Sequence, residues 1–184
     1  MPGKSPADAL HRYLEVLQRT VSCVSREVLK ATAYDDSRPG PYALTLGGFE
    51  PARLRGGVGI SLLIAQQYTF VKRATLSRWQ RWKVETARYD YALHDSTGAE
   101  IIAYHWHPGT WSGRPHLHVQ GYGGPLADFM RKAHLPSGRV SVEEIIRCAI
   151  EEFGAEPLRT DWEAVLAESQ TAFEKFRTWP ISGN

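Results

Sequence analysis

The fold is decided by the stretch Tyr89-Asp90-Tyr91-Ala92-Leu93-His94-Asp95-Ser96-Thr97-Gly98 and by residues 100–106, Glu-Ile-Ile-Ala-Tyr-His-Trp, which follow it. Aromatic and aliphatic residues dominate both arms, as they do in β-strands. Asp-Ser-Thr-Gly between the arms is typical of a hairpin turn. We therefore expect two antiparallel strands joined by a turn that contains Gly98.

The strand before this turn extends back to residue 78, and its apolar alternation slips once. Trp82, Val84 and Thr86 form one alternating set, whereas Tyr89 and Tyr91 continue it one residue out of phase. Because side chains on a strand alternate between two faces, the slip predicts a β-bulge near residues 87–88.

Further strands are expected on both sides of this hairpin. Residues 42–49 and 59–71 are rich in β-formers, and residues 116–122 form a last candidate strand that ends at Gly123-Gly124-Pro125. Residues 42–122 are therefore expected to form an antiparallel sheet of about five strands.

Helices are expected at both ends of the chain. Ser5-Pro6-Ala7-Asp8 has the signature of a helix start, and a periodic apolar stripe from Leu10 to Val28 predicts one helix within residues 1–34 that ends near residues 30–34. A short helix is expected at residues 126–133. Ser141-x-x-Glu144 and Thr160-x-x-Glu163 resemble capping boxes, which predict two further helices within residues 125–180.

These elements indicate a single α+β domain over residues 1–184, with the N-terminal helix and the two C-terminal helices packed on one face of the sheet. No apolar run approaches the roughly 20 residues that span a bilayer, and no secretory signal is recognisable. The two cysteines, Cys23 and Cys148, lie in expected helices and are interpreted as buried thiols of a cytoplasmic protein.

Charge is unevenly distributed along the chain. Residues 1–142 hold 18 basic and 11 acidic residues, a net charge of +7, whereas residues 143–184 carry −5. This polarity is compatible with a basic working face and an acidic helical back, or with surfaces that attract each other within the fold or across a homodimer.

Five of the seven histidines fall between residues 105 and 134. His105 and His107, like His116 and His118, are two residues apart, so each pair lies on one face of a strand. Four gathered imidazoles could bind a divalent metal such as zinc. Alternatively, they could act as general acid and base on a phosphodiester, with Arg114 stabilising developing charge. Because the nearest acidic residues in the sequence are Glu100 and Asp128, we favour acid–base use without a cofactor. Half-exposed strand histidines without a catalytic role are the plainer interpretation.

A basic and aromatic band precedes the hairpin. Its aromatic rings could stack on unpaired bases while its cations neutralise phosphates, which would suit RNA or single-stranded DNA. A solvated strand face with inward tryptophans is the alternative. The band comprises Lys72, Arg73, Arg78, Trp79, Arg81, Trp82, Lys83, Arg88 and Tyr89.

The loop at residues 134–141, His-Leu-Pro-Ser-Gly-Arg-Val-Ser, ends at an expected helix N-cap, so its amides could face an anion. His134 and Arg139 could join the histidine site. A capped loop without a ligand is equally compatible with this sequence.

Two resemblances follow from these motifs. His116-Leu117-His118-Val119-Gln120 looks like the His-x-His-x-Gln strand of nucleotidyl-transferring relatives of the histidine-triad family, which would make His118 a nucleophile. Over about residues 80–135, the order of strand, Gly turn, Tyr104-His105 and Pro-His-x-His is similar to TumE-type toxins of bacterial toxin–antitoxin modules. That resemblance implies a protein that acts on RNA, an antitoxin partner, and site positions at His105, His116 and His118.

The sequence therefore leads to one hypothesis and two alternatives. The hypothesis is a bacterial toxin-like or defence-associated enzyme that cleaves RNA through the histidine cluster. The alternatives are a non-enzymatic accessory protein that binds through the aromatic basic face, and a metal-dependent hydrolase.

Overall fold

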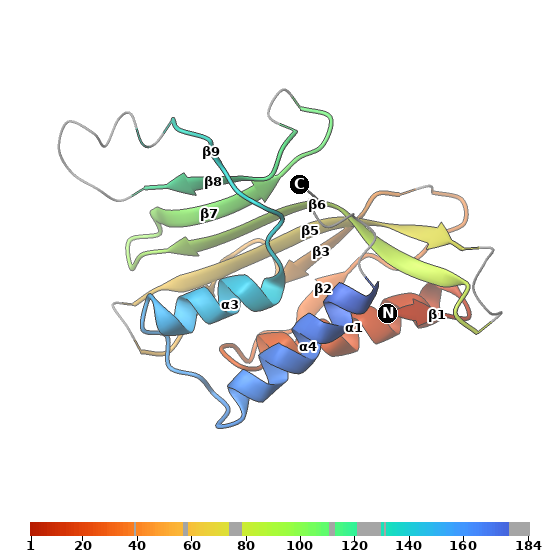
Figure 1. The fold of residues 1–184 in the computed structure, drawn as a ribbon, viewed down its shortest axis with the longest axis horizontal. Coiled ribbons are helices and arrows are strands. Elements are labelled where there is room, and N and C mark those ends of the chain that lie inside the picture. Colours follow the sequence, from red (N-terminus) through yellow and green to blue (C-terminus); the bar gives the residue numbers. More distant parts are fainter. Residues whose placement is uncertain are drawn as a thin grey trace.

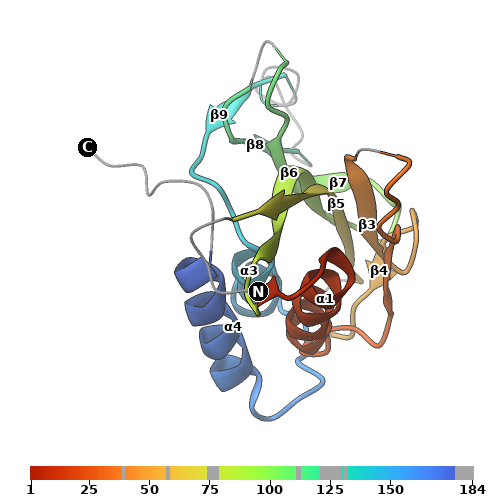
Figure 2. The same ribbon diagram turned by 90° about the vertical axis from the view of Figure 1, so that its right-hand side faces the viewer.

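The computed structural model describes residues 1–38, 40–56, 59–73, 79–110, 113–120, 130 and 132–176. Within these residues, one antiparallel sheet carries the helices α1, α3 and α4 on one face (Figures 1 and 2). The predicted α+β class is confirmed, and so is the packing of the helices on a single face.

The five longest strands of the sheet correspond to the five that the sequence predicts. They are β3 (Tyr42–Leu46), β5 (Ser61–Lys72), β6 (Trp82–His94), β7 (Glu100–Trp106) and β8 (His116–Val119). Among the described residues the sheet has nine strands rather than about five, and it extends beyond residues 42–122. The others are β1 (Pro2–Gly3), β2 (Leu29–Ala31), β4 (Ala52–Arg53) and β9 (Leu135–Pro136), and they are too short to show a period in the sequence.

The central path of the sheet runs β2-β3-β5-β6-β7-β8-β9. In the β5–β6 ladder, Gln67 pairs with Arg88 and Tyr68 pairs with Thr86, so Ala87 is the extra residue of the predicted bulge. The predicted turn is also confirmed, because the Asp95 carboxylate accepts hydrogen bonds from the backbone of Thr97 and Ala99, and Gly98 adopts a φ of +86°.

The first helix is shorter than predicted. α1 spans Pro6–Val21, whereas the sequence pattern predicted a helix that ends near residues 30–34. The segment from Thr20 to Ser25 is rich in β-branched residues and serine, which favour helices weakly. The Gln18 side chain then binds the returning chain, donating to the Glu27 carbonyl and accepting from the Leu29 amide. Cys23 consequently lies in a turn, and Val28 is exposed rather than part of the stripe.

The C-terminal helices are α3 (Val142–Glu151) and α4 (Trp162–Phe176). The predicted capping box at the start of α3 is present, since Ser141 and Glu144 bind each other's backbone amides. Most of the short helix predicted at residues 126–133 lies outside the described residues. In the part of the chain that is described, no helix is both long and apolar enough to traverse a bilayer.

The hydrophobic core lies between the helices and the sheet. Every Tyr, Phe and Trp of β3, β5, β6 and β7 stands on the helix-covered face, as the register shows: Tyr89 is opposite Trp106, and Tyr91 is opposite Tyr104. The Tyr13 hydroxyl of α1 reaches this face, donating to Gln66. The alternate residues of these strands form the opposite face, which we call the open face, and no described helix packs on it.

Candidate metal centre

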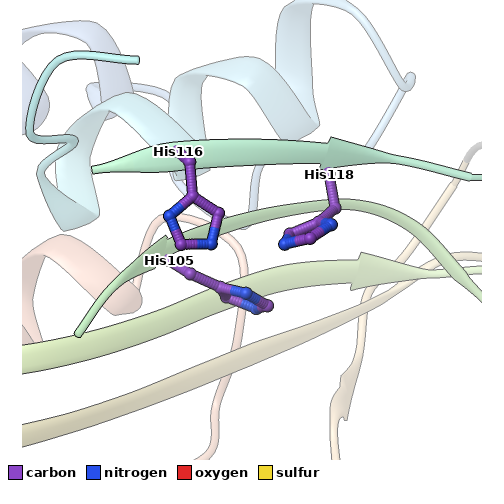
Figure 3. Close-up of side chains that lie close together, drawn as sticks. All are labelled: His105, His116 and His118. Atoms are coloured by element: carbon purple, nitrogen blue, oxygen red, sulfur yellow. The ribbon is translucent and has the colours of Figure 1, made fainter. Parts of the chain in front are cut away.

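The histidine cluster is built by the pairing of β7 with β8 on the open face. His105 lies directly opposite His116, and Ala103 lies opposite His118. Since His116 and His118 are two residues apart on β8, all three rings project from the same side and converge (Figure 3). Each of these three side chains offers a ring nitrogen, and the nitrogens lie within 4.8 Å of one another.

The other two histidines of the stretch border this triad on opposite sides. The His107 ring stacks on His105 with centroids 5.3 Å apart and an interplanar angle of 14°. The His134 ring, on the exposed segment before β9, lies 4.6 Å from both His116 and His118, measured between centroids. The structure therefore brings together all five histidines that the sequence singled out.

A carboxylate that the sequence reasoning missed stands beside the cluster. Asp90 of β6 pairs with His105 across the sheet; its Oδ1 lies 2.5 Å from His107 Nε2 and 3.7 Å from His105 Nε2. Its Oδ2 lies 3.5 Å from Arg88 Nε. The absence of a nearby acid in the sequence was the reason for favouring acid–base use over metal binding, and Asp90 removes that reason.

The environment keeps two members of the triad neutral. Burial lowers the pKa of His105 to about 4, against the opposing effect of the Asp90 charge. Burial and the neighbouring His134 and His116 also lower the pKa of His118. Neutral imidazoles carry the free lone pair that a metal ion requires.

His116 is held in one tautomer by its own backbone. Its Nδ1 lies 2.8 Å from the carbonyl oxygen of Arg114, and because a carbonyl only accepts, Nδ1 must carry the hydrogen. The lone pair of the neutral ring is then on Nε2. Metal-binding histidines in proteins are commonly oriented in this way.

The remaining predicted residues are placed as follows. Arg114 is exposed immediately before β8, and Arg88 is on the open face beside Asp90. Arg139 lies on the other face, with its guanidinium 3.2 Å from the centroid of the Trp106 ring. His134 joins the cluster, but Arg139 does not.

The basic aromatic band does not form one surface. Trp79 and Arg81 are exposed, whereas Trp82 is half-buried against the core and Tyr89 is buried with its ring stacked on Tyr91. Lys83 is half-buried, and burial lowers its pKa to about 8. Arg78 lies outside the described residues. The expectation of interleaved rings that stack on bases is therefore wrong for Trp82 and Tyr89, because strand alternation turns them toward the helices.

Comparisons with protein-family models, with curated proteins and with solved structures found no match for this chain. The resemblance to TumE-type toxins, with the RNA and antitoxin partners that it implies, stays a prediction. The site itself combines three convergent imidazoles, of which burial lowers the pKa of His105 and His118, with a carboxylate beside them on the open face.

Proposed function

We propose that this protein is a metal-dependent hydrolase whose centre is formed by His105, His116 and His118. The observation that carries the proposal is the convergence of three ring nitrogens within 4.8 Å on the open face. Three protein ligands with one position left for water or substrate are typical of catalytic rather than structural zinc sites. An all-imidazole set suits zinc, nickel or copper better than magnesium or calcium.

The residues of the chain have distinct roles in this proposal. His105 and His118 are held neutral by burial, and His116 is fixed by the Arg114 carbonyl. Asp90 orients His107 beside the triad. A bound ion of this class would activate water and polarise the oxygen of a scissile bond. The free thiols of Cys23 and Cys148 agree with the cytoplasmic location proposed from the sequence.

Metal binding is tested first. Isothermal titration of the chelator-treated protein with zinc, cobalt and nickel is expected to show one ion per chain. H105A, H116A and H118A should each lose this binding, while H11A, which removes an exposed histidine of α1, should retain it. Zinc binding that is unchanged in H116A and H118A would contradict the proposal.

Hydrolysis is tested with the loaded protein on bis(p-nitrophenyl) phosphate. Activity should disappear with a chelator, return when the metal is restored, and fall at least about hundredfold in H118A. A variant that binds no metal but hydrolyses the substrate at the wild-type rate would show that the reaction does not need the metal ion.

A second candidate is metal-free acid–base cleavage of RNA, the hypothesis from the sequence. The contact of 2.5 Å between His107 and Asp90 favours it, because a carboxylate that orients an imidazole is the usual partner of a general base. Ribonuclease activity that survives chelation and is lost in H107Q would favour this candidate over the metal centre.

A further inference from the structure

We infer that the ligand of the open face is a phosphodiester chain, bound through its phosphates between Arg88 and Arg114 and not through its bases. For the cleavage step this inference rests on the proposed hydrolase function. Binding of the chain, however, needs no metal ion, so the two can fail separately.

Arg88 supplies a cation on the β6 side of the cluster. Its Nε lies 3.5 Å from Asp90 Oδ2, and the other oxygen of the same carboxylate contacts His107. The Asp90 carboxylate therefore links the Arg88 guanidinium to the histidine cluster. Its side chain keeps 43% of its surface exposed, which leaves N–H groups accessible to an incoming anion.

Arg114 supplies a cation on the opposite side. It lies two residues before the start of β8, and its side chain is exposed. Its carbonyl oxygen accepts a hydrogen bond from His116. Because β7 lies between β6 and β8, the strand that holds Arg88 and the strand that Arg114 precedes are two strand spacings apart, about 10 Å, and the triad projects from β7 and β8. A ligand that engages both cations and still reaches the cluster needs at least two anionic groups.

Between these cations, the described residues of the sheet beneath the histidines include several alanines. Ala92 pairs with Ala103, which is opposite His118, and Ala65 is opposite Asp90. The aromatic residues of the long strands all stand on the helix-covered face, as described above. A chain that lies on this face therefore meets guanidinium groups and the imidazole rings of the cluster, but no Tyr, Phe or Trp of β3, β5, β6 and β7, so phosphates, rather than bases, are the main groups recognised.

The test uses metal-free protein in a chelator and a fluorescein-labelled, 2′-O-methylated oligonucleotide of twelve residues, which hydrolysis cannot consume. Fluorescence anisotropy should detect binding that weakens as salt rises and that differs little between oligonucleotide sequences. R88Q and R114Q should each weaken binding several-fold and reduce the slope of log affinity against log salt by about one. R88K, which keeps the positive charge, should retain most of the affinity that R88Q loses. R26Q, which removes the same charge at an exposed position between α1 and β2, should bind like the wild type.

Three outcomes would overturn the inference. These are no binding by the wild-type protein at low salt, equal weakening in R88Q, R114Q and R26Q, or displacement of the oligonucleotide by poly-glutamate more readily than by unlabelled oligonucleotide, which would indicate an acidic peptide. The zinc titration of the wild-type protein is independent of all three, so a failed metal centre and a failed phosphodiester site are distinguishable.

Discussion

At the scale of single residues, the site depends on which nitrogen each ring presents, and backbone and carboxylate partners decide this. His116 is fixed by a carbonyl and His107 by Asp90, whose Oδ1 also lies near His105. Replacing such an orienting partner typically weakens metal affinity by about 10–100-fold without removing a ligand.

We therefore expect D90N to bind zinc more weakly than the wild-type protein, measured by competition with a chromophoric chelator, because the Asp90 carboxylate lies 3.7 Å from the ligand His105 and holds the neighbouring His107. The amide keeps the size of the carboxylate but loses the charge beside His105 and His107. E85Q, a matched change on the open face of the same strand, should leave the affinity unchanged. Equal affinities for D90N and the wild-type protein would show that Asp90 does not orient the cluster.

The same residue shows where reasoning from the sequence stopped. The i, i+2 spacing of each histidine pair was enough to predict a shared face, and pairing of β7 with β8 brought the rings together. Asp90 is 15 residues before His105 in the sequence, so a search by proximity along the chain passed over it. Counting outward from the turn, where His94 pairs with Glu100, would have placed Asp90 opposite Tyr104 and on the wrong face. The register shift between Leu93 and His94 moves its partner to His105, and the sequence did not reveal this shift.

At the scale of elements, short sequence motifs predicted where helices and turns begin better than they predicted where a helix ends. The start of α1, the α3 capping box, the hairpin and the Ala87 bulge all follow from short motifs whose partners are within a few residues. The end of α1 does not, because Gln18 captures the backbone at residues 27–29 through contacts that the apolar stripe cannot reveal.

The α3 cap supports a second prediction. Ser141 accepts from the Glu144 amide at 3.2 Å and also donates to Gln170 Oε1 of α4 at 2.8 Å. S141A is expected to lower the free energy of unfolding by about 1 kcal/mol, measured by urea denaturation. S137A, in the preceding segment, should be nearly neutral. A loss in S137A as large as in S141A would mean that the cap itself contributes little.

A third prediction concerns the edge of the sheet. β8 has only four residues and β9 only two, so their hydrogen bonds should open more readily than those of β5 and β6. An ion held by His105 of β7 and His116 and His118 of β8 would join the two strands. Hydrogen exchange in β8 is therefore expected to slow when zinc is added, and exchange in β5 should not change. Identical exchange in β8 with and without zinc would argue against an ion that joins these strands.

At the scale of the whole molecule, the sheet divides two tasks between its faces. The helix-covered face holds the aromatic and aliphatic core, while the open face holds the histidines, Asp90 and Arg88. Variants on the open face should consequently change binding with little effect on stability, whereas stability is decided where the three helices meet.

That junction contains a buried carboxyl group. Glu143 of α3 is only 4% exposed and accepts a hydrogen bond from Ser169 of α4, whose hydroxyl lies 2.7 Å from Thr20 of α1. Burial raises the pKa of Glu143. Below the ordinary glutamate pKa, about 4.3, the group is protonated in both the folded and the unfolded chain. Between that value and the raised folded pKa, the folded state binds more protons, so the free energy of unfolding falls as pH rises.

E143Q should remove this dependence, because the amide can accept from Ser169 without ionising. The variant is expected to gain stability relative to the wild-type protein as pH rises from 4 to 8, measured by urea denaturation at each pH. E50Q, which changes an exposed glutamate in the loop after β3, should differ from the wild-type protein by the same amount at every pH. A difference in free energy of unfolding between E143Q and the wild-type protein that is constant, or that shrinks as pH rises, would show that ionisation of buried Glu143 does not destabilise the fold. The pH dependence of the free energy of unfolding would then come from groups other than Glu143.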